Sequence, residues 1–331
     1  MSKKKSKKTY STVLPDKFPE RLEAMFSPSV AAEVRASFVP RPTTLRINRI
    51  KGSEEVIKEL EADGFKFDRV SWYEDAYVLR NKTKRELTDS QPYKLGKMYI
   101  QSLASMVPVL ILDPKPGERI LDLTAAPGSK TSQIAALMAS KGELAANDNN
   151  KVRFFKLKHN MELLGVGDGV VRDQSAAWKF SLHMKHGGDL CRDYPVYFDK
   201  ILLDAPCSAE ARFVANDPDT FGYWSERKIK EMAFKQRSLL FAAWTALKPG
   251  GTLVYSTCTF APEENELQVE RLLERYSDAE LIKINLDLPP ALPPLKAWKG
   301  KDISKALDLA CRIKPTPLIE GFFVVKLRKK M

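Results

Sequence analysis

Two cysteines in the second half of the chain, Cys207 and Cys258, each follow an apolar run typical of a buried β-strand. Each stands in a short stretch of small or polar residues, and Asp204 ends the run that precedes Cys207. A change from strand to small polar loop is typical of the carboxyl edge of parallel strands, where open α/β sheets bind their ligands. The pattern therefore predicts both thiols and the Asp204 carboxylate on one rim of a cleft. Taken alone, the segment around Cys258 also fits a small buried thiol, since free cysteines are among the most buried residues.

A loop of small residues, 122–131, lies between the first strand of the predicted sheet and the helix that follows it. It lacks both glycine patterns that cradle the phosphates of dinucleotides and nucleoside triphosphates. Its position, the first βα turn of a doubly wound sheet, is nevertheless where a cofactor approaches the backbone. Asp148 comes 20 residues after Gly128, at the end of the second strand, where an acid commonly holds a ribose diol. An adenosine-containing cofactor without a pyrophosphate fits, and S-adenosylmethionine is the obvious candidate; the alternative is a tight turn with a solvated aspartate.

Two thiols and a carboxylate beside a methyl donor favour one reaction, the methylation of a pyrimidine ring at C5. C5 is a poor nucleophile, but a thiolate that adds to C6 makes an enamine-like carbanion at C5, and loss of the C5 proton later restores the ring. Asp204 is expected to hydrogen-bond N3 of the ring and to stabilise the charge that develops. Lys130 is expected to supply the positive field that ionises a thiol. The chemistry alone does not decide which of the two cysteines attacks.

Three segments together carry a family resemblance: TAAPGSKT at residues 124–131, DAPCS at 204–208 and YSTCTFAPEENE at 255–266. In this order they resemble the RNA cytosine-5 methyltransferases, the bacterial rRNA enzymes and their eukaryotic Nop/Sun relatives, over about residues 18–331. The resemblance implies a seven-stranded, Rossmann-like class I methyltransferase fold with S-adenosylmethionine as cofactor. It implies structured RNA as substrate, with small-subunit rRNA favoured and tRNA as the alternative.

The same resemblance assigns roles to individual residues. It implies that Cys258 is the nucleophile and that Cys207 assists release of the product. Cofactor binding is implied for Thr124, Ala125, Ala126, Pro127, Gly128, Ser129, Lys130, Asp148, Arg153, Asp173 and Asp204. The chain departs from the family pattern at Ala209 and Ala211, where relatives usually have glycine. If that loop needs a positive φ, alanine costs on the order of 1 kcal/mol there.

The elements that must position these residues alternate from residue 119 onward. Strands are expected at 119–123, 142–146, 170–171, 198–203 and 252–255, with edge strands at 281–284 and 322–327, and helices at about 129–140, 150–164 and 225–247. This alternation predicts a doubly wound, mostly parallel α/β sheet. A helix over 91–112 is expected to lead into it, and residues 289–298, which are rich in proline, are expected to form a surface loop.

The region before this sheet divides into a basic tail, residues 1–15, and a small α+β module over 16–90, with the catalytic domain over 91–331. Basic residues such as Arg46, Arg69 and Arg80 interleave with Trp72, Tyr73 and Tyr77 in the module. Basic and aromatic side chains on a small sheet suit single-stranded RNA, which offers phosphates to bind and bases to stack on.

Bulk composition limits the partners and the compartment. The net charge of +12 favours a polyanion, although a merely soluble basic protein has the same charge. No apolar run approaches the roughly 18 residues of a membrane span, and no secretory signal is present. The four cysteines form no CxxC pair, so a metal site is not expected. Free thiols in a protein of the cytoplasm are expected instead. Nothing indicates a dimer seam, and a monomer is expected.

Two other functions compete with RNA methylation. A non-catalytic RNA-binding or ribosome-assembly factor on the same fold is supported only by Ala209 and Ala211, and the retention of both thiols and of Asp204 argues against it. Methylation of DNA cytosine is disfavoured because no long target-recognition region lies between the motifs and the end of the sequence.

Overall fold

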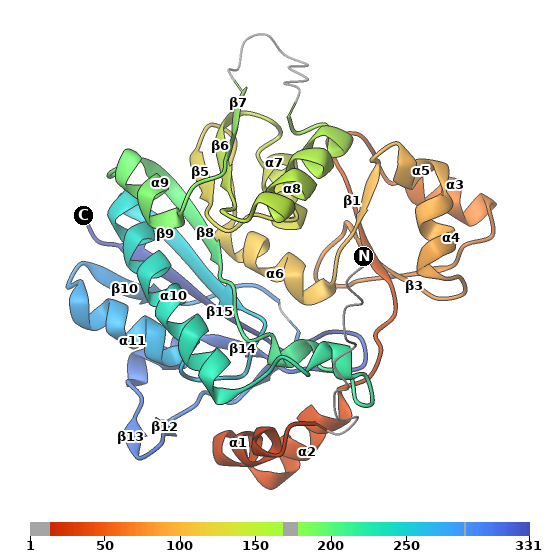
Figure 1. Ribbon diagram of the computed structural model, residues 1–331. Helices are drawn as coiled ribbons and strands as arrows, with labels where there is room; N and C mark the ends of the chain where they lie inside the picture. The colour runs from red at the N-terminus through yellow and green to blue at the C-terminus, as the bar shows by residue number, and fades with distance from the viewer. Residues whose placement is uncertain (1–13, 168–177, 288) are drawn as a thin grey trace, which may run out of the picture.

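The computed structural model describes residues 14–167, 178–287 and 289–331, and one large sheet dominates it (Figure 1). Its strands are β5 (Arg119–Asp122), β6 (Gly142–Asn147), β7 (Trp178–His183), β8 (Phe198–Asp204), β9 (Leu247–Thr257), β10 (Ala279–Ile282), β11 (Ala291–Leu292), β14 (Cys311–Ile313) and β15 (Phe322–Lys329). They are ordered β11-β14-β15-β9-β8-β5-β6-β7, with β10 also paired to β15. β5 to β9 run parallel to their neighbours, while β15 is antiparallel to β9.

The predicted doubly wound sheet is therefore confirmed, with a difference in its size. Six of the seven predicted strands are present, as β5, β6, β8, β9, β10 and β15, and β7 lies where the sequence predicted no strand. The short strands β11 and β14 extend the sheet to nine, because β14 pairs with the edge of β15 that β9 leaves open. The strand expected at 170–171 lies outside the described residues.

Helices cover both faces of this sheet, as Figure 1 shows. One face carries α6 (Leu103–Leu112), α7 (Ser129–Leu137) and α8 (Lys151–Leu164), and the other carries α9 (Gly187–Asp193), α10 (Glu226–Ala246) and α11 (Glu266–Arg275). Successive strand residues point to opposite faces. Accordingly, Leu202 packs in the core beneath the first group of helices and Leu203 in the core beneath the second.

The long helix predicted over 91–112 is wrong. The chain forms α5 (Gln91–Lys94), then β4 (Met98–Ile100), and only then α6. Gly96 lies between α5 and β4 with φ +70°, and a Cβ there would collide with the Leu163 carbonyl oxygen. The turn at Gly96 therefore ends the helix and lets the apolar run after it pair with another strand. The predicted loop 289–298 also contains short strands, namely β11 and β12 (Ala297–Trp298), the latter paired with β13 (Lys301–Asp302).

A second, four-stranded sheet precedes the large one and has the order β2-β3-β1-β4. Its parts are β1 (Thr44–Ile47), β2 (Phe67–Arg69), β3 (Ala76–Leu79) and β4, with α3 (Glu55–Ala62), α4 (Lys84–Asp89) and α5. The sheet has a core of its own, which includes Leu45, Val56 and Leu60.

Three of the residues expected to face RNA on this sheet, Tyr73, Tyr77 and Arg46, are internal, while Arg69 and Arg80 are exposed. Of the aromatic residues, Tyr73 and Tyr77 are buried, and only Trp72 is partly exposed. Arg46 is fully buried and joins the sheet to the catalytic region, since it donates to the side chains of Gln101 (3.1 Å) and Ser132 (2.9 Å). The expectation that these three residues contact RNA is therefore wrong, because their side chains build the core and the interface with α7.

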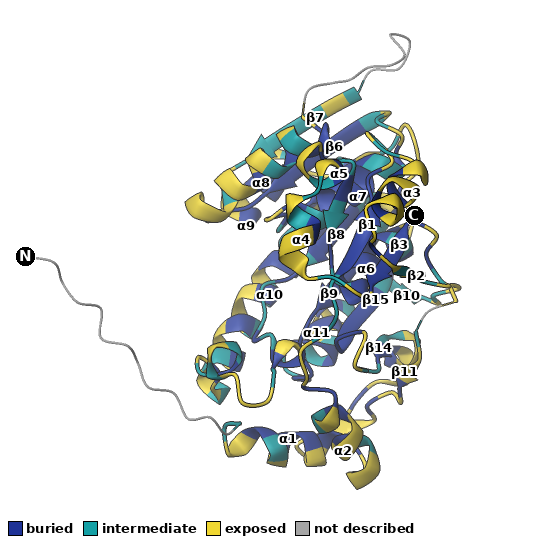
Figure 2. Cartoon of the chain, turned by 90° about the vertical axis from the view of Figure 1, so that its right-hand side faces the viewer, coloured by how far each residue is buried: buried dark blue, intermediate teal, exposed yellow. Residues whose placement is uncertain are grey.

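The first two helices, α1 (Lys17–Met25) and α2 (Pro28–Ala36), lie far from the small sheet (Figure 2). Phe18 of α1 packs on Phe213 and Trp224, with ring centroids 4.9 and 5.6 Å apart. Residues 16–90 therefore form two separate pieces, of which the helical one shares the core of the large domain. In the described ranges, no helix combines the length and the apolar character that crossing a bilayer requires. Most of the predicted basic tail lies outside those ranges.

Candidate active site

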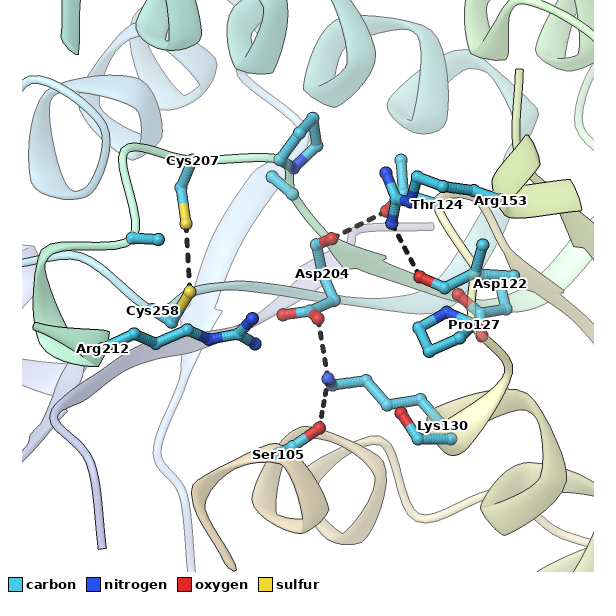
Figure 3. A pocket seen from close by; sticks show the side chains of 16 residues that line it. Ser105, Asp122, Thr124, Pro127, Lys130, Arg153, Asp204, Cys207, Arg212 and Cys258 are labelled. Carbon is cyan, nitrogen blue, oxygen red and sulfur yellow. Dashed lines mark hydrogen bonds and ion pairs between the residues drawn. The ribbon is translucent and has the colours of Figure 1, made fainter. Parts of the chain in front are cut away.

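A cavity of about 380 Å³ opens at the carboxyl ends of β5, β8 and β9 (Figure 3). Three loops supply most of its wall: the one after β5, the one after β8, and the one after β9. This is the edge at which ligands bind in open α/β sheets. The lining residues are Ser105, Asp122, Thr124, Ala125, Ala126, Pro127, Ser129, Lys130, Arg153, Asp204, Ala205, Pro206, Cys207, Ala209, Arg212 and Cys258.

The two cysteines meet in this cavity. β8 and β9 are parallel neighbours with Asp204 opposite Ser256, so the loops that follow them begin at the same level. The Sγ atoms of Cys207 and Cys258 lie 3.3 Å apart, within hydrogen-bonding distance for sulfur. The predicted common rim is therefore what the structure shows. The hydrogen bond from the Cys207 thiol, together with Arg212, lowers the pKa of Cys258 to about 7, while the pKa of Cys207 is raised well above its ordinary value because its proton is held in that bond.

Lys130 and Asp204 form a pair beside the thiols. The Lys130 ammonium lies 2.7 Å from Asp204 Oδ2 and donates to Ser105 Oγ at 2.6 Å, while Ser256 Oγ donates to Asp204 Oδ1 at 2.8 Å. Lys130 was expected to supply the field that ionises the thiol. The structure differs, because the Lys130 charge is matched by the Asp204 carboxylate, and the cation that lowers the pKa of Cys258 is Arg212.

The loop after β5 turns sharply into α7. Gly128 has φ +105°, and a Cβ there would lie 2.5 Å from Met161 Cε of α8, so only glycine fits. Thr124 Oγ1 donates to the Asp204 carbonyl at 2.8 Å, which ties this loop to the end of β8. Of the loop residues predicted to bind the cofactor, 124–130, all except Gly128 line the cavity.

Asp122, which ends β5, has an unsatisfied oxygen in the cavity wall. Thr131 Oγ1 donates to Asp122 Oδ2 at 2.7 Å, but Oδ1 is buried without a partner among the described residues. Burial raises the pKa of this carboxyl to about 7. A buried acceptor left open toward a cavity indicates that a donor on a ligand completes it.

A second cavity of about 400 Å³ shares Thr124, Arg153 and Pro206 with the first. Asp148, at the end of β6, lines the second cavity, and its carboxylate lies 3.3 Å from the Arg153 guanidinium. Arg153 also donates to the Ala126 carbonyl at 2.7 Å, so it stands between the two cavities. Asp173, the remaining predicted cofactor residue, lies outside the described residues.

A buried polar network fixes the two cysteine loops to each other. Glu264 accepts from the backbone N–H of Ser208 at 2.9 Å and from its hydroxyl, and it also accepts from Gln236 Nε2 of α10 at 2.8 Å. The Ser208 hydroxyl lies 2.8 Å from Thr259 Oγ1, and Thr259 in turn donates to Glu210 at 2.9 Å. Ser208, which follows Cys207, is thus bonded to Thr259, which follows Cys258. This bond holds the two sulfur atoms close together.

Two family models match the chain. The model of the 16S rRNA methyltransferase RsmB/F family matches residues 109–328, and the model of the N-terminal domain of the 16S rRNA methyltransferase RsmF matches residues 14–103. The chain belongs to the RsmB/F family of RNA methyltransferases.

The chain matches its individual relatives over different shares of their length. It is 36% identical to a tRNA (cytosine(49)-C(5))-methyltransferase of Pyrococcus abyssi, over 88% of this chain and 89% of that protein. It is 35% identical to the ribosomal RNA small subunit methyltransferase F of Aeromonas salmonicida, over 96% of this chain and 64% of that protein. The crystal structure of a methyltransferase homologue from Pyrococcus horikoshii superposes with a TM-score of 0.79 at 33% identity, covering 96% of each chain.

Ala209 and Ala211, where the resemblance implies glycine, differ in backbone conformation. Ala209 has φ +57°, in the left-handed region that favours glycine, whereas Ala211 has no positive φ and is fully buried. Only Ala209 is strained, and its loop still brings Cys207 to Cys258.

Sequence reasoning missed the residues that act on the predicted ones: Ser105, Arg212, Ser256 and Glu264. Ser105 comes from α6, and nothing in the sequence indicates that α6 reaches the cavity. Arg212 carried a usable signal, a basic residue in the small polar loop that contains Cys207.

Proposed function

We propose that this protein is an S-adenosylmethionine-dependent methyltransferase that forms 5-methylcytosine in RNA through a covalent bond between Cys258 and C6 of the base. The observation that carries the proposal is the contact between Cys207 and Cys258, 3.3 Å apart in a cavity that Asp204 also lines. Buried thiols paired only for packing do not need a cavity or a carboxylate beside them. The reaction needs both thiols reduced, which suits the cytoplasm.

The two cavities, which share Thr124, Arg153 and Pro206, suit the cofactor. Its amino-acid part carries an ammonium group, which suits the open Oδ1 of buried Asp122. Asp148 would hold the ribose diol in the second cavity, and the loop after β5, residues 124–130, would pass along the sulfonium side, with Arg153 between the two. When bound there, S-adenosylmethionine supplies an electrophilic methyl group.

The residues of the chain perform the remaining chemistry. The Cys258 thiolate adds to C6 of cytosine, and the electron pair moves to C5, which becomes nucleophilic. Asp204, held by Lys130 and Ser256, accepts a hydrogen bond from the N4 amino group of the base and so orients the ring while it is saturated. After methylation, the C5 proton passes to water, the electron pair of the C5–H bond forms the C5–C6 double bond, and the S–C6 bond breaks to restore the Cys258 thiolate. The Cys207 thiol donates a hydrogen bond to the leaving sulfur and so assists release.

RNA as the substrate rests on the relatives and on charge. The names of the relatives specify tRNA or small-subunit rRNA, and the net charge of +12 suits a polyanion. We favour rRNA because both family models describe 16S rRNA enzymes. A tRNA substrate is the second candidate. It is favoured because the chain matches 89% of the archaeal tRNA enzyme but only 64% of the rRNA enzyme.

Two cysteine variants test the mechanism. Cys258→Ala should abolish methyl transfer to RNA while S-adenosylmethionine binding, measured by calorimetry, survives. Cys207→Ala should instead accumulate a covalent RNA adduct, seen as a shifted band on a denaturing gel. Full activity of Cys258→Ala together with no adduct in Cys207→Ala rejects the mechanism. Bisulfite sequencing of RNA from a deletion strain identifies the nucleotide and separates rRNA from tRNA.

A further inference from the structure

We propose that Arg212 is the positioning residue that makes Cys258, rather than Cys207, the nucleophilic sulfur of the pair. This proposal rests on the proposed function and deepens it, because it names the group that selects between two thiols in contact. Neither the family resemblance nor the sequence pattern assigns a role to Arg212.

The position of Arg212 supports this role. It is the last residue of the short 3₁₀ helix η1 (Glu210–Arg212), which follows Cys207, and its side chain lies in the cavity wall. Figure 3 shows its guanidinium directed into the cavity between Cys258 and Asp204. The backbone places it there, since Ala211 N–H donates to the Cys258 carbonyl at 3.1 Å and anchors η1 to the Cys258 loop.

Arg212 differs from the other two cations of the cavity in what it binds. Lys130 is engaged by Asp204 and Ser105, at 2.7 and 2.6 Å, and Arg153 by Asp148 and the Ala126 carbonyl, at 3.3 and 2.7 Å. The Arg212 guanidinium makes no hydrogen bond or ion pair within the parts of the chain that the structure describes, although it lies among negative and ionisable groups. A cavity-facing guanidinium left free in this way is available to a thiolate and to the substrate.

The groups that face Cys258 have opposite effects on its pKa. The thiol of Cys207 and the guanidinium of Arg212 lower the pKa of Cys258, while Asp204 and the buried Glu320 raise it. The Cys258 thiolate in turn is the main cause that raises the pKa of Arg212. Tyr223, half-exposed on the loop before α10, has a pKa raised to about 12 by partial desolvation and by the two cysteines, so it stays neutral.

The pKa values of Cys207 and Cys258 differ because different groups lie beside each thiol. Glu264, bonded to the residue after Cys207, adds to the raised pKa of that thiol. Arg212 lowers the pKa of both thiols, but Cys258 raises the pKa of Arg212 more than Cys207 does, and Arg212 also acts against the two carboxylates that face Cys258. One proton shared between two sulfurs thus stays on Cys207, and the negative charge stays on Cys258, where it can add to C6.

The test measures alkylation of Cys258 in the full chain, without RNA or cofactor. The rate of modification by iodoacetamide is followed against pH by peptide mass spectrometry, because only the thiolate reacts. In Arg212→Met the midpoint of the Cys258 profile should rise by about one pH unit or more, since an opposite charge nearby shifts a pKa by about 1–3 units. Arg212→Lys should restore most of the shift. Arg227→Met, which removes an exposed arginine on α10, should leave the profile unchanged.

The outcomes separate this proposal from the proposed function. The role of Arg212 is overturned if the Cys258 alkylation profile of Arg212→Met has the same midpoint pH as that of the wild type. It is also overturned if the midpoint shifts as far in Arg212→Lys as in Arg212→Met. Arg212→Gln, measured in the same way, replaces the methionine variant if that variant does not fold by circular dichroism. Methyl transfer is measured separately, and a wild-type protein that shows the expected alkylation profiles but never methylates RNA rejects the proposed function while leaving the electrostatic role intact.

Discussion

Ser208, which follows Cys207, is bound through both its backbone N–H and its hydroxyl to the carboxyl group of Glu264, which lies two residues before α11. Glu264 is fully buried and also accepts from Gln236. Burial raises the pKa of Glu264 to about 8, so the carboxyl that positions the loop is protonated over much of the range below neutral pH.

We predict that Glu264 makes stability fall as pH rises. An unfolded glutamate has a pKa of about 4.3, and a folded value near 8 means that ionisation opposes folding. The contribution to the free energy of unfolding is full below about pH 4 and is lost as pH rises toward 8. Glu264→Gln should therefore reduce the decline of Tm between pH 5 and 8.

The matched control for this prediction is Glu274→Gln, at an exposed position of α11, which should leave the slope unchanged. Burial also raises the pKa of Glu210 and Asp122, so the slope should shrink without vanishing. An identical slope in wild type and Glu264→Gln would contradict the prediction.

The two alanines after Ser208 should respond to glycine in opposite directions. At Ala209, with φ +57°, glycine relieves a left-handed strain of about 1 kcal/mol, so Ala209→Gly should raise the free energy of urea unfolding by up to that amount. At Ala211, which is buried without positive φ, glycine adds backbone freedom to the unfolded chain and removes a packed methyl group. Ala211→Gly should therefore destabilise by about 1 kcal/mol. Equal effects of the two changes would disprove this reading of the loop.

Much of the fold was predictable because its signals are local. The alternation of apolar runs and helical stripes gave the strands β5, β6, β8 and β9, and the small polar residues after β8 and β9 placed both cysteines at one edge. The failure at residues 91–112 has a physical cause outside that segment. Gly96 must turn because α8, some 70 positions later in the chain, places the Leu163 carbonyl against it, and no local pattern shows this.

The site was predicted as a set of residues and not as a set of contacts. Lys130 was expected beside a thiol because both are needed for one reaction, but its ion pair with Asp204 depends on how α7 faces β8. Tyr73, Tyr77 and Arg46 were expected at a surface because composition carries no information about which side of a four-stranded sheet is covered. Side-chain facing is decided by tertiary packing, and sequence periodicity over strands of three or four residues is too short to reveal it.

A buried ion pair holds the other side of the Cys258 loop. Arg312 of β14 binds Glu266 through two parallel bonds of 2.6 and 2.5 Å and also donates to the Phe260 carbonyl at 3.0 Å. Both side chains are almost completely buried. Glu266→Gln should destabilise the protein by about 3–5 kcal/mol in urea unfolding, because it leaves the Arg312 charge uncompensated in the interior.

Two further variants check the cause. Replacing both partners, as in Arg312→Met with Glu266→Leu, should recover much of the loss, since no unpaired charge remains. Glu55→Gln, which breaks the exposed pair with Lys58, should leave the unfolding curve unchanged. A loss for Glu266→Gln no larger than that of Glu55→Gln would show that the buried pair is not required.

Finally, the contact between Cys207 and Cys258 predicts a selective oxidation. Sulfur atoms 3.3 Å apart need only a small rotation to bond, so diamide should convert the two thiols to a disulfide, each sulfur losing a proton and an electron as the azo group is reduced. The low pKa of Cys258 speeds the first attack, because the thiolate is the reactive form. Cys191 and Cys311 should stay reduced, since burial raises their pKa values to about 12 and 11. Peptide mapping should find one cross-link, between Cys207 and Cys258, that dithiothreitol reverses. Methyl transfer should be lost on oxidation and should return on reduction. Oxidation that spares this pair, or that modifies all four cysteines alike, would show that the two sulfurs are not in contact in solution.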